Sequence, residues 1–149
     1  GPQVMSGYWN QPAETENTLI DGRLHTGDIG YMDEQGYTFL IDRIKDLILV
    51  GGFNVFPRVV EEAIYQHAAV AEVTVVGLPD ELKGQRIKAF VKLADGAALT
   101  AEELHEFLVP KIGKHEMPKD IEFRDELPKT LVGKLSKKEL VAEEAAKSE

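Results

Sequence analysis

The sequence predicts an α+β fold, in which a β-hairpin is followed by a small mixed sheet with flanking helices. The first observation behind this prediction is that short apolar runs typical of strands occur beside segments with the apolar spacing of helices. The second is the order of these elements from residue 45 onward, β-β-α-β-β-α-β-α, which is typical of a compact α+β domain. No internal repeat interrupts this order.

Residues 1–42 predict loops and short strands. The segment 10–19 contains proline and many polar residues, so we expect a loop or a short helix there. Two apolar-aromatic runs within 23–43 flank the residues Asp-Glu-Gln-Gly at 33–36, which is a hairpin signal with glycine at the turn. Because this part of the chain is poor in core-forming elements, we expect it to be the end of something larger.

The segment 46–56 contains two strand-like runs around Gly51 and Gly52. A two-residue Gly-Gly connection suits a tight hairpin, since such turns need positive φ. Pro57 then opens a helix, because proline is tolerated in a first helical turn and apolar residues recur after it at helical spacing.

Two further strands are expected over 70–78 and 86–93, with a loop over 79–85 between them. Thr100 and Glu103 form a capping-box pattern, which predicts the start of a helix that ends near a proline ten residues later.

The C-terminal part of the sequence predicts one more strand and one more helix. The strand lies within 119–127, and the segment 128–134 follows it as a loop. The last helix covers 135–147, with Ser136 as its expected N-cap.

The chain has 149 residues, which is enough for one ordinary domain with its own core. It has no cysteine, which excludes disulfides and thiolate metal sites and is compatible with a reducing compartment, so we expect a cytoplasmic location. Its four histidines show no ligand spacing, so we expect no metal site in this chain. No apolar run is long enough to span a bilayer, and the first residues lack the order of a signal peptide.

The net charge of −9 argues against nucleic acid as a partner, because phosphate neutralisation needs clustered lysine and arginine. The charge is uneven, however, and basic residues are dense between Lys111 and Lys138. A local basic patch on an acidic protein fits a small polyanion better than a duplex, although a solvated face would show the same pattern.

Five short motifs are candidates for function. They are TGD at 26–28, DRIKD at 42–46, LVGGFNVFP at 49–57, GLPDELKGQRIKAFV at 77–91 and PKTLVGK at 128–134. Each also has a purely structural explanation. Asp28 could bond local backbone N–H groups at a turn, or its carboxylate could accept two ribose hydroxyls. The paired glycines could simply form a turn, and they could also let a ligand approach the backbone closely.

Lys134 lies just before the last predicted helix. It is either a solvated charge or a contact for a bound anion. A cation is disfavoured at a helix N-terminus by the helix dipole, so a bound anion would relieve a mild local conflict.

Taken together and in this order, the five motifs resemble the C-terminal portion of the adenylate-forming enzymes. This superfamily comprises acyl-CoA synthetases, peptide-synthetase adenylation domains and beetle luciferases, and the chain is most similar in character to fatty acyl-CoA synthetases. The resemblance covers nearly the whole chain. It implies that residues 1–44 are the incomplete end of a large N-terminal AMP-binding domain and that residues 45–149 are the small C-terminal domain. The phosphate loop and acyl pocket of the family are missing, so we expect the fragment alone to be inactive.

The resemblance implies an ATP-dependent enzyme that activates a fatty acid as acyl-AMP and then transfers the acyl group to CoA. Lys134 matches the catalytic lysine, which bridges the acyl carboxylate and the α-phosphate side. Asp28 matches the residue that holds the ribose hydroxyls, and Arg43 would contact the nucleotide or its phosphates. Mg²⁺ would be held mainly by the missing domain and by the phosphates.

In this family the small domain rotates between the two half-reactions. Lys45 matches the hinge position, where relatives usually carry Asp or Lys. Gly51, Gly52 and Phe53 would line the tunnel for the pantetheine arm of CoA, and Lys119 matches a basic position that meets a CoA phosphate.

The expected partners are ATP, fatty acid, CoA and the chain's own N-terminal domain. A lysine acetyltransferase is a further expected partner, because acetylation of Lys134 would remove its charge. One alternative is an adenylation domain for aryl or amino acids. From a different class, the alternatives are an interaction domain without chemistry or a substrate of an acetyltransferase.

Overall fold

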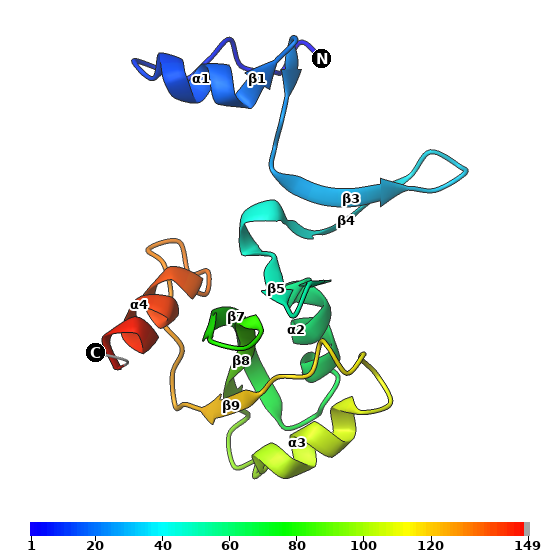
Figure 1. Cartoon of the computed structure of the whole chain (residues 1–149), viewed down its shortest axis with the longest axis vertical. Coiled ribbons are helices and arrows are strands. Elements are labelled where there is room, and N and C mark those ends of the chain that lie inside the picture. Colours follow the sequence, from blue (N-terminus) through cyan, green and yellow to red (C-terminus); the bar gives the residue numbers. More distant parts are fainter. Residues whose placement is uncertain (148–149) are drawn as a thin grey trace. The chain divides into compact units, whose positions relative to one another are not determined.

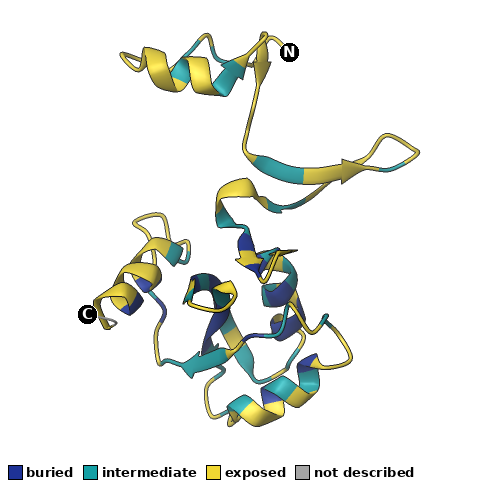
Figure 2. Ribbon diagram, viewed as in Figure 1, coloured by how far each residue is buried: buried dark blue, intermediate teal, exposed yellow. Residues whose placement is uncertain are grey.

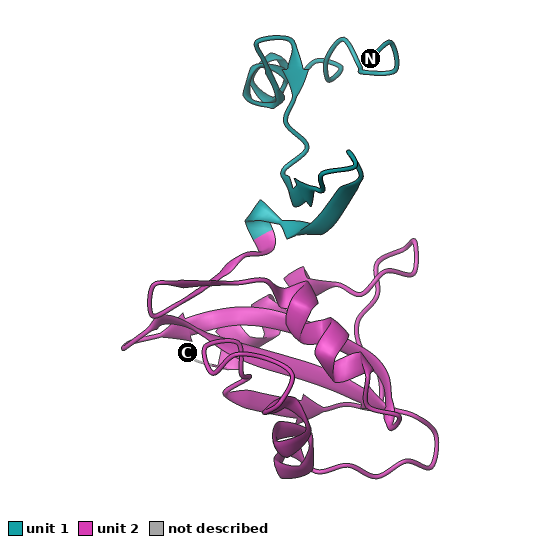
Figure 3. Cartoon of the chain, turned by 90° about the vertical axis from the view of Figure 1, so that its right-hand side faces the viewer, with its two compact units in different colours: residues 1–45 teal, residues 46–149 magenta. Residues whose placement is uncertain are grey.

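The computed structural model describes residues 1–147, and the chain divides into two compact units. Unit 1 comprises residues 1–45, and unit 2 begins at Asp46 (Figure 3). The division falls one residue after the position expected from the sequence.

Unit 1 is built from short elements. Its strands β3 and β4 pair antiparallel as the predicted hairpin, and the Asp33 carboxylate at the turn accepts hydrogen bonds from the N–H groups of Gln35 and Tyr37 at 3.0 and 2.9 Å. The elements are α1 (Pro12–Thr18), β1 (Leu19–Ile20), β2 (Arg23–Leu24), β3 (Asp28–Met32) and β4 (Thr38–Arg43), and the 3₁₀ helix η1 (Ile44–Asp46) follows them.

None of residues 1–45 is buried (Figure 2). Several large apolar side chains of unit 1 are exposed, among them Trp9, Tyr31 and Leu40. Unit 1 therefore has no hydrophobic core of its own.

Within its described residues, 46–147, unit 2 contains one five-stranded sheet and three α-helices (Figure 1). The strands run in the order β6-β5-β8-β7, and β9 pairs parallel with β8 while the other pairs are antiparallel. The prediction of an α+β fold with a mixed sheet is confirmed, as is the order of elements from residue 46. The elements are β5 (Ile48–Val50), β6 (Phe53–Val55), α2 (Pro57–Tyr65), β7 (Val70–Asp80), β8 (Gly84–Leu93), α3 (Ala101–Leu108), β9 (Asp120–Phe123) and α4 (Lys137–Lys147).

The connection between β7 and β8 is shorter than the sequence predicts. The predicted loop over 79–85 is mostly strand, since β7 continues to Asp80 and β8 begins at Gly84. Its polar composition indicates a loop, but antiparallel pairing with the neighbouring strand overrides this local preference. Pro79 is tolerated because β7 is an edge strand, where a missing N–H breaks no ladder bond.

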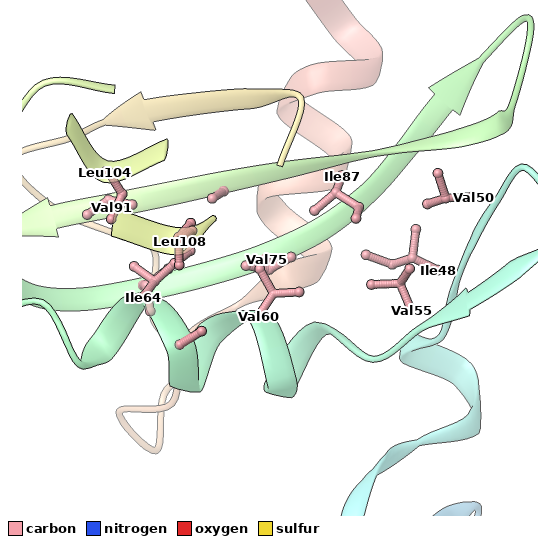
Figure 4. Packing of buried hydrophobic residues seen from close by; sticks show 13 residues of the cluster. Ile48, Val50, Val55, Val60, Ile64, Val75, Ile87, Val91, Leu104 and Leu108 are labelled. Carbon is pink, nitrogen blue, oxygen red and sulfur yellow. The ribbon is translucent and has the colours of Figure 1, made fainter. Parts of the chain in front are cut away.

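Both faces of the β7–β8 hairpin are buried, and alternate residues point to opposite faces. One face packs against α2 and α3, and Figure 4 shows Val75 of β7 beside Val60 of α2, and Val91 of β8 beside Leu104 of α3. The other face packs against α4 through a second cluster, which consists of Val76, Leu78, Phe90, Leu127 and Leu140. The capping box of Thr100 and Glu103 at the start of α3 is confirmed.

A charged cluster accompanies the second apolar cluster. The Lys88 ammonium is nearly buried, and it lies 2.7 Å from a carboxylate oxygen of Glu122 and 2.7 Å from one of Glu144. The Arg124 guanidinium also bonds Glu122, at 2.7 Å. Both cations lie over the ring of Phe90, at 4.9 and 4.6 Å from its centroid. Buried charges need such partners, because an unpaired one is costly.

This cluster changes the protonation of its members. Burial alone would raise the pKa of Glu122, but hydrogen bonds from Lys88 and Arg124 outweigh burial and lower this pKa to about 2. Burial alone would lower the pKa of Lys88. Its hydrogen bonds to Glu122 and Glu144 outweigh burial and raise this pKa.

The charged cluster predicts how stability depends on pH. The pKa of Glu122 falls from an ordinary 4.5 to about 2 on folding, so its contribution is present above pH 4.5 and is lost as the pH falls toward 2. We expect the free energy of unfolding to decrease over this range, and Glu122→Gln to flatten the decrease. The same variant should destabilise the chain at pH 7 by about 1–3 kcal/mol, because Lys88 loses a carboxylate partner.

Urea denaturation followed by circular dichroism between pH 2 and 6 measures both effects. Glu106→Gln on the exposed side of α3 is the matched control, and it should keep the wild-type pH dependence. If both variants had the same pH profile, the charged cluster would not be the source of the effect.

Candidate functional site

Asp28 and Arg43 form an ion pair at the open end of the hairpin in unit 1. They are cross-strand partners, and the Nε atom of Arg43 lies 3.2 Å from Oδ1 of Asp28. Gly27 has φ +75° in the turn before β3, and the Asp28 N–H donates to Oγ1 of Thr26 at 3.2 Å. Both charged side chains are partly exposed, so a carboxylate and a guanidinium are held side by side within reach of a ligand.

The hairpin of β5 and β6 turns at Gly51 and Gly52, as predicted. These residues have φ of +56° and +87°, which is the conformation of a type I′ turn. A Cβ atom at either glycine would meet no other atom within 4 Å. The backbone conformation therefore favours glycine, while the space beside the turn is open.

Phe53 links this hairpin to the segment before β9. Its ring is more than half exposed, and it stacks on the His115 imidazole with 4.9 Å between centroids and 29° between planes. The Gly51 N–H donates to the carbonyl oxygen of Lys83 at 2.9 Å, which joins the hairpin to the β7–β8 turn.

A cavity of about 300 Å³ lies between the β5–β6 hairpin, the β7–β8 turn and the segment before β9. Its wall combines apolar and basic side chains on a protein of net charge −9, so it is suited to an anion with an apolar portion. The lining residues are Val50, Lys83, Arg86, Ile87, His105, Lys114, His115, Met117, Pro118 and Lys119.

Two of the basic residues in this wall are paired with carboxylates. The Lys119 ammonium lies 2.9 Å from Oδ2 of Asp80, and Nε of Arg86 lies 2.9 Å from Oδ2 of Asp120. The hydrogen bond from Lys119, aided by backbone N–H groups of the β7–β8 turn, lowers the pKa of Asp80 to about 2. Asp80 is therefore ionised at neutral pH and orients Lys119 at the cavity.

Lys134 lies in a closed turn before α4. Lys129 and Leu135 form an antiparallel bridge at the base of this turn, and the Thr130 N–H donates to the Lys134 carbonyl oxygen at 2.7 Å. Gly133 has φ +80°, and the Lys134 N–H donates to Oγ1 of Thr130 at 3.2 Å. The Lys134 side chain is exposed, and its ammonium makes no ion pair with any residue between 1 and 147.

The structure brings some of the predicted site residues together and leaves others apart. Among the predicted site residues, Lys119 lines the cavity, whereas Gly51, Gly52, Phe53 and Lys134 do not. The hairpin reaches the cavity through Val50, and Phe53 stacks on the lining residue His115. Asp28 and Arg43 pair with each other in unit 1.

His115 was not identified from the sequence, and Lys83 and Arg86 were included only as part of the motif at 77–91. The basic patch predicted after Lys111 includes Lys114 and Lys119, which line this cavity. The β7–β8 residues join it only through the pairing of β8 with β5 and β9, which no local pattern encodes.

Within residues 1–147, no group of three or more histidine, cysteine, aspartate or glutamate side chains is arranged to hold a metal ion. No helix in the same part of the chain has the length and apolar character needed to cross a membrane.

Comparison with known proteins identifies relatives of this chain. The long-chain-fatty-acid–CoA ligase of Bacillus subtilis is 52% identical over 97% of this chain, which corresponds to 26% of that protein. The chain therefore spans about a quarter of the length of the curated relatives it matches.

Two solved structures share the fold at similar coverage. ATP-bound MatB from Rhodopseudomonas palustris has a TM-score of 0.89 and 35% identity, over 96% of this chain and 29% of its own. The o-succinylbenzoate CoA synthetase MenE from Bacillus subtilis, in complex with its acyl-adenylate intermediate, has a TM-score of 0.88 and 35% identity, over 94% of this chain and 28% of its own.

The family model of the AMP-binding enzyme C-terminal domain matches residues 59–134, about half of the chain. This match includes most of the sheet and of α2, the whole of α3 and the turn that ends at Lys134. It also includes every residue that lines the basic cavity except Val50. The chain belongs to the family of AMP-binding enzyme C-terminal domains.

Proposed function

We propose that this chain is the C-terminal portion of an ATP-dependent long-chain fatty acyl-CoA synthetase. The observation that carries the proposal is the 52% identity to a long-chain-fatty-acid–CoA ligase over 97% of the chain. Residues 1–44 would be the end of the large AMP-binding domain, which accords with the lack of buried residues in unit 1. Residues 45–149 would be the small domain, and the fragment alone would be inactive because the phosphate loop and acyl pocket belong to the large domain.

In the first half-reaction, a carboxylate oxygen of the fatty acid attacks the α-phosphorus of ATP. The bond from this phosphorus to the bridging oxygen of the β-phosphate breaks, and pyrophosphate leaves. Both reactants are anionic, so a fixed cation stabilises the charge where they meet. Lys134 would supply this cation, since its ammonium is exposed and no described residue neutralises it.

Asp28 and Arg43 would bind the nucleotide. The Asp28 carboxylate would accept hydrogen bonds from the ribose hydroxyls. The neighbouring Arg43 guanidinium would contact the nucleotide or its phosphates. Mg²⁺ would be held by the triphosphate and the large domain.

In the second half-reaction, the thiol sulfur of CoA attacks the acyl carbonyl carbon and the thiol gives up its proton. The bond from this carbon to the phosphate oxygen breaks, and AMP leaves. The open space beside Gly51 and Gly52 would admit the pantetheine arm, with Phe53 as an apolar wall. The basic cavity next to this turn would receive a CoA phosphate, with Lys119 as one contact.

The small domain would rotate between the two half-reactions, because Lys134 and the Gly51–Gly52 turn belong to different loops. Lys45 would be the hinge. It is exposed within η1, and the division between units 1 and 2 falls directly after it.

The proposal also includes a cytoplasmic location, where ATP and CoA are available, and regulation by a lysine acetyltransferase. Acetylation of Lys134 would remove the charge on which the first half-reaction depends. Mass spectrometry after incubation with such an enzyme and acetyl-CoA would test this part, and an unmodified Lys134 would refute it.

ATP–pyrophosphate exchange by the full-length protein across a panel of acids tests the function itself. Exchange with long-chain fatty acids supports the proposal, and exchange confined to aryl or amino acids favours an adenylation enzyme of that kind. If no acid supported exchange, a role without chemistry would be favoured.

Lys134→Ala in the full-length enzyme should reduce acyl-adenylate formation by roughly 10²–10³-fold, because a preorganised cation is removed from the transition state. Transfer from supplied acyl-AMP to CoA should be unchanged. Pyrophosphate release and CoA consumption measure the two steps separately, and Lys138→Ala is the control nearby. Equal loss of both half-reactions would contradict this role.

Lys119→Gln should raise the KM for CoA by roughly 10-fold, since one charge-assisted contact to a phosphate is lost. Steady-state kinetics with CoA as the varied substrate measures this change, while the KM for ATP should stay constant. Lys138→Gln makes the same change of charge at an exposed position of α4 and serves as the control. An unchanged KM for CoA would remove Lys119 from the site.

Lys45→Pro should stop one half-reaction and leave the other, because proline fixes φ near −65° and prevents the hinge from moving. Lys45→Ala keeps the backbone free and should support both steps. Pyrophosphate release and the transfer from acyl-AMP to CoA distinguish these outcomes. Normal overall turnover by Lys45→Pro would exclude Lys45 as the hinge.

A further inference from the structure

The segment of residues 130–136, called here the Lys134 loop, is flanked at both ends by ion pairs to other elements. Before it, the Lys129 ammonium lies 2.7 Å from Oε1 of Glu72 on β7. After it, the Lys137 ammonium lies 2.9 Å from Oε1 of Glu61 on α2. Each end of the loop is therefore joined to an element of the core.

Glu61 is an ordered acceptor. Its side chain is 17% exposed, and the oxygen that meets Lys137 also accepts a hydrogen bond from the Val75 N–H at 2.9 Å. This N–H lies on the outer edge of β7, where residues 1–147 form no neighbouring strand. The hydrogen bond from β7 already fixes the Glu61 carboxylate. The ion pair with Lys137 therefore costs less conformational entropy than an ion pair between two mobile surface side chains.

Glu72 has few partners besides Lys129. Its side chain is 24% exposed, and its Oε2 atom is buried and has no hydrogen-bond partner among the described residues. A partly buried carboxylate is costly without compensation. This cost favours the conformation in which Lys129 stays against β7.

The tip of the loop has no comparable restraint. Leu131 and Val132 are 109% and 79% exposed, whereas Leu135 at the base packs against the second apolar cluster. The position of Lys134 therefore depends on the base of the loop and on the two ion pairs beside it.

We propose that Glu61 and Glu72 are positioning residues, which hold the two ends of the Lys134 loop and so place its ammonium for acyl-adenylate formation. The inference rests on the proposed function, because it assigns Lys134 to that step. Neither carboxylate needs to touch a substrate. A small displacement of a fixed charge is enough to slow such a reaction, and about 1 Å can cost roughly 10²-fold.

Amide hydrogen exchange on the chain itself tests the anchoring without any assumption about activity. Glu61→Gln keeps an oxygen for the Val75 N–H but removes the charge that Lys137 meets. The amides of Thr130 and Lys134 should then exchange roughly 3–10-fold faster, while those of β8 keep their rates. Glu62→Gln changes the adjacent residue, which pairs with Arg58 on the exposed side of α2, and should leave the loop unchanged. Unchanged exchange, or equal acceleration in the loop and β8, would overturn the anchoring.

Kinetics of the full-length enzyme test the consequence for catalysis. Glu61→Gln and Lys137→Gln should each lower kcat for acyl-adenylate formation by roughly 10-fold, with the transfer from acyl-AMP to CoA unaffected. Lys137→Arg keeps the charge and should restore most of the rate, and Lys138→Gln should behave as wild type. Equal rates in Glu61→Gln and Glu62→Gln, or a parallel loss of both half-reactions, would overturn the positioning role.

The same experiments separate this inference from the proposed function. If the wild-type enzyme forms no acyl-adenylate, or if Lys134→Ala leaves that step intact, the proposed function fails and the positioning role fails with it. If Lys134→Ala abolishes the step while Glu61→Gln does not slow it, the positioning role fails alone.

Discussion

The antiparallel pairing of β7 with β8 is the interaction on which the rest of unit 2 depends. Its register places Val75 opposite Ala89 on one face and Thr74 opposite Phe90 on the other. The first face supports α2 and α3, and the second supports α4 with its charged cluster. Because both faces are covered, a slip of one residue would exchange the two sets of side chains and disrupt both clusters.

The same pairing assembles the candidate CoA site. Gly84, at the start of β8, pairs with Val50, which brings the β5–β6 hairpin to the β7–β8 turn. Farther along β8, the Ile87 carbonyl oxygen accepts a hydrogen bond from the Lys119 N–H, and β9 follows in parallel. Three segments that are distant in sequence therefore meet along one strand and enclose the basic cavity.

The features that the sequence predicted correctly are those with local causes. The Gly-Gly hairpin at 51–52 follows from positive φ, and the start of α3 follows from the reciprocal bonds of Thr100 and Glu103. Residues 79–80 and 84–85 are strand because β7 and β8 pair with each other there, whereas their local composition predicted a loop. Local patterns did not place His115 against Phe53, since that contact depends on tertiary packing. The roles of Lys134, Asp28 and Lys45 were suggested by resemblance and remain predictions.

The ion pair between Lys119 and Asp80 has a consequence for any anion that enters the cavity. The pKa of Asp80 is lowered to about 2, so at neutral pH its carboxylate is ionised and already pairs with Lys119 before an anion enters. An anion that binds Lys119 must therefore compete with Asp80. Its gain in free energy is the difference between its own ion pair with Lys119 and the existing ion pair of Lys119 with Asp80. A monoanion gains little from this exchange, because it replaces one carboxylate with a similar charge. A dianionic phosphate gains more, so in the proposed CoA site the internal carboxylate would favour phosphate esters over carboxylates.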